Sequence, residues 1–172
     1  MFYKMLLSMS MLLIAGAVFA QKPVVTAVTD VEDSPSNGME MCRSLFNEYY
    51  LSVLSTHSKV NTVDTASVQK AIAKLKIRRG VKLSAKQISA LCRELKTNAL
   101  CLVKVSRQGK NSIRIKVGVV TANGKRAGMV SAVMEGIGDT DAASSKLALE
   151  SAKLLRKSAG IKELSASPVV RK

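Results

Sequence analysis

Aromatic residues and histidine are scarce in this chain of 172 residues. It has no tryptophan, three tyrosines, three phenylalanines and a single histidine, His57. Proteins that bind single-stranded nucleic acid stack bases on aromatic side chains, so this composition argues against nucleic acid as a partner. One histidine without any Cys-x-x-Cys pair also argues against a zinc site. We therefore expect no metal and no cofactor.

Cysteine is also rare, and its number is odd. The three cysteines are Cys42, Cys92 and Cys101, far below the density of a disulfide-stapled domain. Cys92 and Cys101 are close enough in sequence to bridge across a turn between a helix and a strand. The simpler alternative is that both are small buried thiols.

Catalytic motifs are missing as well. The chain has no Gly-x-Ser-x-Gly or His-Glu-x-x-His motif and no phosphate-binding loop, and His57 stands in a Ser- and Thr-rich segment typical of a surface loop. The Gly136–Gly138 segment is too short for a dinucleotide fingerprint and is interpreted as a hinge. We expect no enzyme, and an enzyme of unknown type is only the third-ranked hypothesis.

Residues 1–20 have the pattern of a secretory signal peptide. Lys4 precedes an apolar run from Met5 to Val18, and Val18 and Ala20 are small residues in the positions that signal peptidase requires. This run is shorter than the ~20 residues that span a bilayer, which disfavours the alternative of an uncleaved anchor. No cysteine follows closely enough for lipidation. We expect a soluble, unlipidated periplasmic protein without a transmembrane segment after cleavage.

Acidic residues are few, and the basic excess is concentrated in one region. The chain has 27 Lys and Arg against 12 Asp and Glu, and residues 65–126 contain 16 of the basic residues with Glu94 as their only acidic one. Such a region favours an envelope protein or an anionic envelope surface as partner, while a solvated face is the simpler alternative. The predicted partner-binding residues are Lys74, Lys76, Arg78, Arg79, Lys82, Lys104, Arg114 and Lys116.

Hydrophobic periodicity predicts four helices. Apolar residues recur at helical spacing in residues 39–56 and 140–157, with Leu147 and Leu155 facing inward in the second of these. Asp64 is the expected cap of a helix that ends at Gly80. The Ser84 and Gln87 pair predicts a capping box for the next helix. We expect Asn98 to end that helix in a left-handed conformation.

Five β-branched or apolar runs predict strands: residues 23–31, 59–63, 99–106, 112–121 and 126–135. A type I′ turn at Asn123-Gly124 sets Val119 opposite Gly128 and continues an entirely apolar face. A five-residue loop before it, residues 107–111, sets Val105 opposite Ile113. The reverse face then has Lys104 opposite Arg114, with Lys116 and Ser131 beside them, and is at least partly solvated.

Acidic side chains follow the first two predicted strands. They are Asp30, Glu32, Asp33 and Asp64. Ligands of open α/β sheets bind at the carboxyl ends of strands, so a divalent cation is one alternative there. Helix entry and helix capping explain Asp33 and Asp64 more simply.

Together these elements predict a single α/β domain over residues 21–159, followed by a flexible tail at 160–172. The order β-α-β-α-α-β-β-β-α predicts a mixed sheet of about five strands with helices packed on it. Residues 24–31, 63–72, 93–103 and 117–125 resemble the strand, helix and hairpin motifs of the group that contains the TolB amino-terminal domain, CsgG and LpoB, the penicillin-binding-protein activator.

This resemblance implies a protein-interaction or assembly module of the bacterial envelope without catalytic activity. The chain differs from these proteins because it has no cysteine for lipidation, no propeller and no long insertions for a membrane barrel. The alternative function is a soluble periplasmic chaperone, or a structural subunit of a secretion or assembly machine, that uses the edge of its sheet for strand addition.

Overall fold

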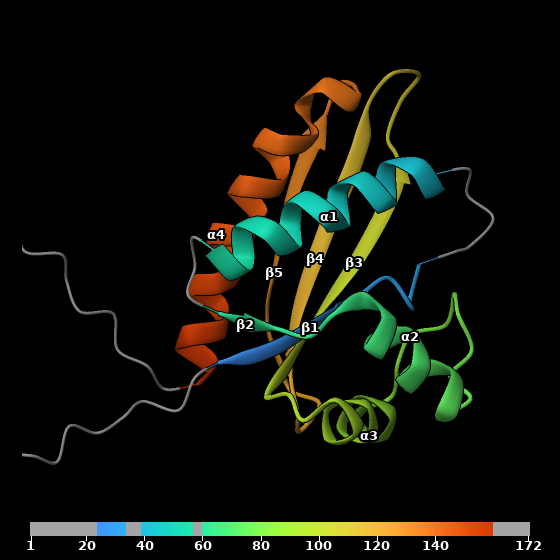
Figure 1. The fold of residues 1–172 in the computed structure, drawn as a ribbon. Helices are drawn as coiled ribbons and strands as arrows, with labels where there is room; N and C mark the ends of the chain where they lie inside the picture. Colours follow the sequence, from blue (N-terminus) through green and yellow to red (C-terminus); the bar gives the residue numbers. More distant parts are fainter. Residues whose placement is uncertain (1–23, 34–38, 57–59, 160–172) are drawn as a thin grey trace, which may run out of the picture.

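Strands and helices follow one another in the order that the sequence predicts (Figure 1). The computed structural model describes residues 24–33, 39–56 and 60–159. The strands are β1 (Val25–Thr29), β2 (Asn61–Thr62), β3 (Ala99–Arg107), β4 (Ile113–Thr121) and β5 (Arg126–Met134). The helices are α1 (Glu40–Thr56), α2 (Thr65–Lys74), α3 (Ala85–Leu95), a short 3-10 turn (Ile137–Asp139) and α4 (Thr140–Ser158). The predicted signal peptide, the predicted tail and His57 lie outside the described residues.

All five strands belong to one mixed sheet, in the order β2-β1-β3-β4-β5. β1 runs parallel to both of its neighbours, whereas β3, β4 and β5 are antiparallel to one another. Parallel neighbours need long crossover connections, and the segments between β1, β2 and β3 provide them with α1, α2 and α3. The predicted α/β fold and its element order are therefore confirmed.

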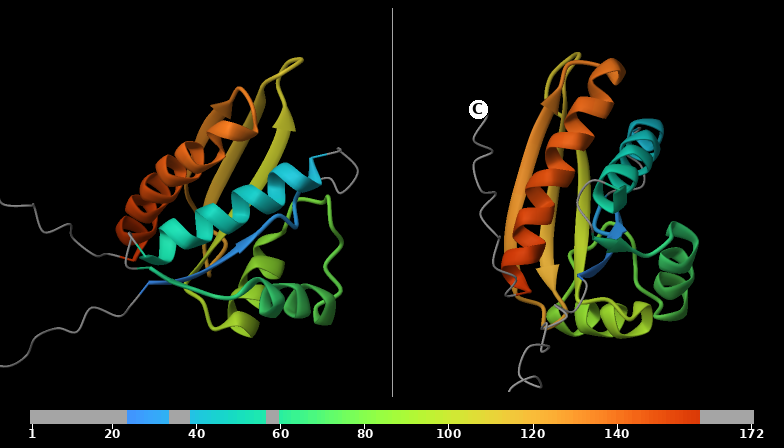
Figure 2. Two further views of the ribbon diagram at one scale, coloured as in Figure 1. Left: turned by 45° about the horizontal axis from the view of Figure 1, so that its top comes forward. Right: turned by 60° about the vertical axis from the view of Figure 1, so that its left-hand side comes forward.

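Helices cover the two faces of the sheet unequally (Figure 2). α1 and α4 pack on one face, and α2 and α3 pack on the other. Successive residues of a strand point to opposite faces, so Cys101 and Val103 of β3 belong to the first core and Leu100 and Leu102 to the second. The first half of β3, Ala99–Val103, is therefore buried on both sides, which explains its continuous apolar sequence, whereas from Lys104 onwards only Val105 is buried.

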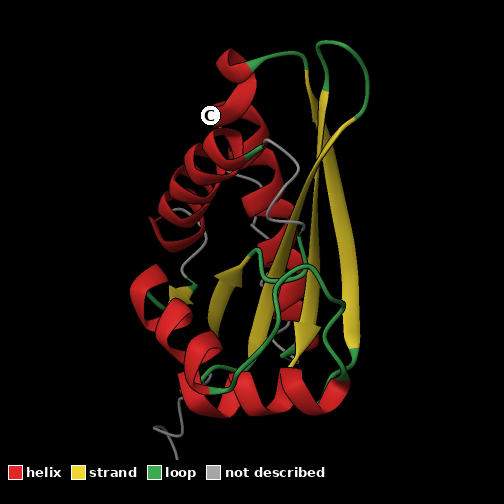
Figure 3. Cartoon of the chain, turned by 90° about the vertical axis from the view of Figure 1, so that its right-hand side faces the viewer, coloured by secondary structure: helices red, strands yellow, loops and turns green. Residues whose placement is uncertain are grey.

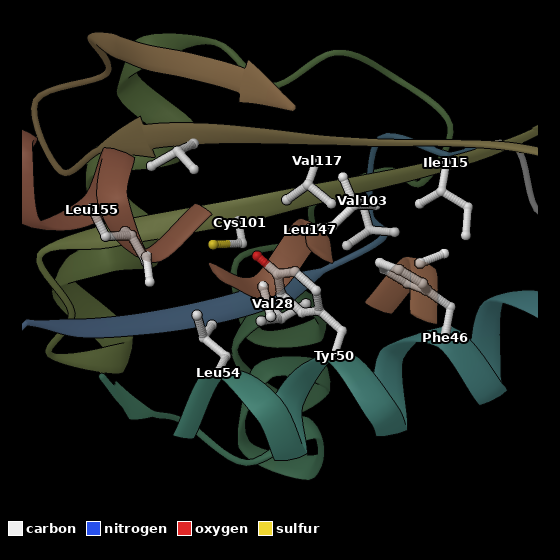
Figure 4. Close-up of a cluster of buried hydrophobic side chains, with 14 of the residues drawn as sticks. Val28, Phe46, Tyr50, Leu54, Cys101, Val103, Ile115, Val117, Leu147 and Leu155 are labelled. Carbon is white, nitrogen blue, oxygen red and sulfur yellow. The ribbon is translucent and has the colours of Figure 1, made fainter. Parts of the chain in front are cut away.

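The first core is built around the inner face of α1 (Figure 4). Phe46, Tyr50 and Leu54 recur at a spacing of four residues and are fully buried. The rings of Phe46 and Tyr50 stack with their centroids 5.3 Å apart. Figure 4 shows the Tyr50 hydroxyl directed towards the sulfur of Cys101. Burial, with a smaller contribution from Cys101, raises the pKa of Tyr50 well above its usual value, so this side chain stays neutral.

Both predicted helix starts are confirmed. The Asp64 side chain accepts a hydrogen bond from the Ser67 backbone N–H, and this interaction with Ser67 lowers the pKa of the carboxyl group. Ser84 accepts from the Gln87 backbone N–H, and the Gln87 side chain accepts from the Ser84 N–H in return.

Two of the four predicted helix ends are wrong, those of α2 and α3. α2 stops at Lys74 and not at Gly80, because Lys76 takes the left-handed conformation (φ 50°) and the Lys76 and Ile77 N–H groups donate to the Ala73 and Ile72 carbonyls. The Gly80 N–H instead donates to the Val31 carbonyl, just after β1. α3 is ended by Lys96 in the left-handed conformation and not by Asn98. Asn98 instead pairs with β1, since its N–H donates to the Val25 carbonyl and its side-chain oxygen accepts from the Val25 N–H.

The predicted register between β3 and β4 is wrong by two residues. The structure pairs Val105 with Ile115, because β3 continues to Arg107 and pairs there with Ile113. A shift of two residues keeps every side chain on its predicted face of the sheet, so the face predicted to be apolar is apolar in the structure. The consequence is that Lys104 lies opposite Lys116, and not opposite Arg114.

The β4–β5 pairing is confirmed, although its turn differs. Val119 lies opposite Gly128, as predicted. A type I′ turn needs a positive φ at both central residues, but Gly124 (φ 82°) has one and Asn123 does not. The ladder also contains an irregularity, since Val120 lies opposite Arg126 and one extra residue of β5 intervenes. Beyond this bulge, from the Val119–Gly128 pair onwards, β4 and β5 pair in the predicted register.

The cysteines are free thiols. Cys92 lies in the core under α2 and α3, and Cys101 lies in the core under α1 and α4. The sheet separates the two side chains, which rules out the disulfide that sequence proximity allowed. Burial raises the pKa of both thiols. None of the described helices is both long and apolar enough to cross a membrane.

Candidate binding surface on the open face of the sheet

The face of the sheet that packs on α2 and α3 is only partly covered. Figure 3 shows α3 crossing one end of the sheet while the β3–β4 hairpin extends far beyond it. Lys104 is exposed on this open part, and Arg114 and Lys116 are half-buried. The side chains of Met129 and Val133 on β5 are 56% and 48% exposed. The open face is partly solvated and contains cations, as the sequence predicts for the reverse face of the meander, and it also has accessible apolar groups, which were not predicted.

A recess of about 300 Å³ lies in this face. Basic residues dominate its lining, which consists of Glu32, Lys82, Leu102, Lys104, Lys116, Gly118, Arg126 and Met129. Four cations and one carboxylate give the lining a strongly positive charge. We call this feature the cationic recess.

Glu32 is the acidic residue of the cationic recess, and its side chain is almost fully buried, with 4% exposed. One carboxylate oxygen accepts a hydrogen bond of 2.8 Å from the Leu83 N–H, and the other lies 3.4 Å from Nζ of Lys104. Glu32 thereby joins the loop after β1 to the segment before α3 and holds the Lys104 side chain on one side of the recess. A buried carboxylate bound in this way is a positioning group.

Neighbouring carboxylates fix the same loop through further contacts. Asp33 accepts hydrogen bonds of 3.0 Å from Nε of Arg43 and from the Val105 N–H. Asp30 lies 3.7 Å from Nε of Arg43 and 3.8 Å from the Arg79 guanidinium. The three acidic residues that follow β1 are therefore engaged with α1, with β3 and with the segment after α2.

This arrangement disfavours the alternative of a divalent cation at the end of β1. The carboxylates there are paired with arginine and lysine side chains, and Asp64 caps α2. Within residues 24–33, 39–56 and 60–159, no three His, Cys, Asp or Glu side chains form a group suited to a metal ion. The acidic cluster acts in the described structure as an anchor for the loop.

Lys104 and Lys116 face each other across β3 and β4. Like charges directly opposite each other on a sheet are destabilising. Glu32 offsets part of this repulsion at Lys104, whereas Lys116 has no ion pair with any described carboxylate. A bound anion between the two ammonium groups would remove the remaining repulsion.

Gly118 leaves the floor of the cationic recess without a side chain. It lies in the middle of β4, opposite Leu102. A Cβ added at this position would approach only the Leu102 carbonyl oxygen, at 3.9 Å, so packing does not require glycine here. Glycine weakens a strand interior and often marks a place where a ligand approaches the backbone. Packing alone therefore does not explain why residue 118 is a glycine, and this glycine leaves open space above the strand.

The predicted partner-binding residues do not form one cluster. Lys82, Lys104 and Lys116 meet in the cationic recess, and Arg114 lies on the same face opposite Ser106. Lys74 is separate, because its Nζ is 2.7 Å from Glu94 on α3. The rest of the set lies in the segment after α2, where Lys76 and Arg78 are exposed and Arg79 contacts Asp30 and Gln69.

Arg126 lines the recess but is not among the predicted partner-binding residues. An uninterrupted ladder from the Val119–Gly128 pair would set Arg126 opposite Thr121 and turn it to the face covered by α1 and α4. The bulge sets Arg126 opposite Val120 and therefore turns it to the open face. No residue pattern in the strand indicated the bulge.

Comparison with known proteins returns structures but no sequence relatives. No protein-family model matches the chain, and no curated protein matches it in sequence. Among solved structures, the C-terminal domain of LpoB from Escherichia coli matches with 15% identity and a TM-score of 0.49 over 73% of this chain and 90% of that domain. The longer E. coli LpoB structure matches with 14% identity and a TM-score of 0.48, and the match covers 63% of this chain and 55% of LpoB.

Two further solved structures show similar scores. Lipoprotein GNA1162 from Neisseria meningitidis matches with 17% identity and a TM-score of 0.45, over 65% of this chain and 80% of the lipoprotein. PelC from Paraburkholderia phytofirmans, solved as a dodecamer, matches with 8% identity and a TM-score of 0.46, over 79% of this chain and 90% of PelC. At these levels the matches assign neither partner nor activity to this chain. LpoB, which the sequence motifs resemble, is thus among the structures to which this chain is similar.

Proposed function

We propose that this chain is an exported envelope protein without catalytic activity, which binds an acidic segment of another envelope protein through the cationic recess. The observation that carries this proposal is the juxtaposition of Lys82, Lys104, Lys116 and Arg126 around the open floor at Gly118. Carboxylate side chains match this charge, and Met129 adds an exposed apolar contact at the same place.

The geometry favours a protein over a small substrate. The cations lie on a wide, partly open sheet face, and no residue of the recess has the pairing of nucleophile and base that catalysis needs. Interfaces combine an apolar centre with a polar rim. Met129 and Leu102 with their surrounding cations have this composition. Export is supported by the signal-peptide pattern of residues 1–20.

Photo-crosslinking in living cells tests the proposal. A photoreactive residue at Met129 should crosslink one acidic partner, whereas the same residue at the exposed Leu149 of α4 should not. Charge reversal by Lys104→Glu together with Lys116→Glu should remove the Met129 crosslink. A crosslink that persists after charge reversal, or the lack of any crosslink at Met129, would contradict the proposal.

Export needs its own measurement. The purified protein should begin at Gln21 by intact mass, and protease added to cells with a permeabilised outer membrane should degrade it. A protein that keeps residues 1–20 and resists the protease would contradict the proposed location.

Strand addition at the edge of the sheet is a second candidate function, as in a periplasmic chaperone or an assembly subunit. The observation that favours it is β5, a strand of nine residues at the end of the sheet with β4 as its only described partner. Binding through backbone hydrogen bonds would persist in raised salt, whereas binding through the cationic recess would weaken. Salt dependence of the Met129 crosslink therefore distinguishes the two functions.

A further inference from the structure

A second basic surface lies on α2 and α3, apart from the cationic recess. Its cations are exposed and come from both helices and their ends; they are Lys70, Lys74, Lys76, Arg78, Lys86, Arg93 and Lys96. Glu94 is the only acidic residue of this part of the chain. We call this feature the α2–α3 surface.

A shallow recess of about 330 Å³ lies between the two helices on this surface. Val63, Ala71 and Leu95 provide its apolar lining, and Lys70, Lys74 and Lys96 provide its ammonium groups. Glu94 neutralises one of these three cations, because it pairs with Lys74. The other two have no ion pair with a described carboxylate. Apolar lining beneath free ammonium groups suits the boundary between phospholipid headgroups and acyl chains.

Both helices end next to a lysine in the left-handed backbone conformation. Lys76 follows α2 with φ 50°, and Lys96 caps α3 with φ 53°. Glycine is the residue that usually occupies such positions, because a side chain makes the conformation unfavourable. Lys76 and Lys96 are the only non-glycine residues with positive φ in the described structure. The chain therefore retains a charge at each of two places where glycine would fit the backbone better.

An exposed apolar residue accompanies these cations. Val81 is 49% exposed in the segment between α2 and α3, directly before Lys82 and two residues after Arg79. An exposed apolar side chain in a basic segment can enter the headgroup region while cations bind the phosphates.

From these observations we propose that the α2–α3 surface docks the protein on a membrane that contains anionic phospholipid. The ammonium groups of Lys70, Lys76 and Lys96 bind lipid phosphates, and Val81 enters the interface. The cationic recess, which we propose as the site for a protein partner, is lined by other residues than this shallow recess, and its Lys82 directly follows Val81. Docking would restrict the protein's search for that partner to the membrane surface.

Vesicle flotation tests this inference with a pair of matched variants. The probes are phosphatidylcholine vesicles and vesicles in which about one third of the lipid is phosphatidylglycerol. The variant Lys76→Gly with Lys96→Gly removes two charges and the unfavourable backbone conformation, so its melting temperature should be unchanged or higher. Its affinity for the anionic vesicles should fall by about 25-fold, since each lysine near an anionic surface contributes about 1 kcal/mol.

The control variant removes the same number of charges elsewhere. Lys146→Ala with Lys153→Ala changes two exposed lysines of α4 and should lower the affinity by less than about threefold, through the net charge alone. Equal losses in the two variants would overturn the inference, as would equal binding of the wild-type protein to neutral and anionic vesicles. All variants carry the same N-terminal residues, so any contribution of residues 1–20 cancels. Because the cationic recess is unchanged in both variants, the Met129 crosslink tests the proposed function independently.

Discussion

Lys104 and Lys116 lie directly opposite each other on β3 and β4, and Glu32 reaches only the first of them. Two ammonium groups in cross-strand register repel each other, and a packed sheet gains nothing from the pair. Both lysines line the cationic recess, for which we propose a binding role. Because the two lysines repel each other, removing one of them should raise stability while it weakens binding.

Lys116→Thr should stabilise the protein and weaken partner binding. The substitution removes the repulsion and places a residue of high β-propensity in the strand, so the free energy of unfolding should rise by about 0.2–1 kcal/mol. Urea denaturation measures this change. Lys125→Thr at the exposed hairpin serves as a control and should alter neither stability nor the Met129 crosslink. A less stable Lys116→Thr protein would contradict the prediction.

Gly118→Ala should preserve or raise stability, because a Cβ finds free space there and alanine restricts the unfolded chain, with an expected gain of about 0.4–1 kcal/mol. Gly124→Ala should instead cost about 1–3 kcal/mol, since Gly124 has a φ of 82° and an added Cβ would lie 2.6 Å from the Ala85 Cβ. Thermal unfolding compares the two variants. If the space above Gly118 receives the partner, Gly118→Ala should lower the Met129 crosslink without loss of stability.

Arg43→Met should destabilise the protein by about 3–5 kcal/mol, because it leaves the Asp33 and Asp30 carboxylates without their buried cation. Lys74→Met breaks an exposed ion pair with Glu94 and should cost about 0–1 kcal/mol. Urea denaturation of both variants provides the measurement. Similar losses in the two variants would show that the buried pair is no more important than the exposed one.

Alkylation should distinguish the three thiols at mildly alkaline pH. Burial raises the pKa of Cys92 and Cys101, so the reactive thiolate is less populated at pH 8 than in an ordinary cysteine, and both side chains are also inaccessible. Cys42 is half-buried and should react first. Mass spectrometry should find one label on the native protein and three after unfolding. The Cys42→Ser variant should take no label while it is folded.

Local chemistry made several parts of the fold predictable. Asp64 and Ser84 cap their helices because a short polar side chain can bind a free N–H of the first turn, whatever the rest of the protein does. The alternation of apolar residues in β3, β4 and β5 assigned their faces because the strand period is two. Both signals depend on residues within a few positions of each other.

Features that depend on distant contacts were not predictable. Gly80 lies beyond the end of α2 and donates its N–H to Val31, and Asn98 does not cap α3 because it pairs with Val25 of β1. The β3–β4 register moved by two residues because β3 extends to Arg107, so that the five-residue loop begins one residue later, at Gln108. Each of these features involves hydrogen bonds to another segment of the chain, which local sequence patterns do not specify.

The sequence by itself determined the α/β order of elements, the apolar faces of the strands and the concentration of basic residues between 65 and 126, because these follow from composition and periodicity. Only the tertiary structure decided which of those cations lie in the cationic recess and which lie on the α2–α3 surface. The two-residue shift set Lys104 against Lys116, the bulge turned Arg126 to the open face, and the turn after β1 brought Glu32 beneath Lys104. Register and bulge are selected by the packing of whole strands, and a side chain's neighbours on a sheet follow from that selection.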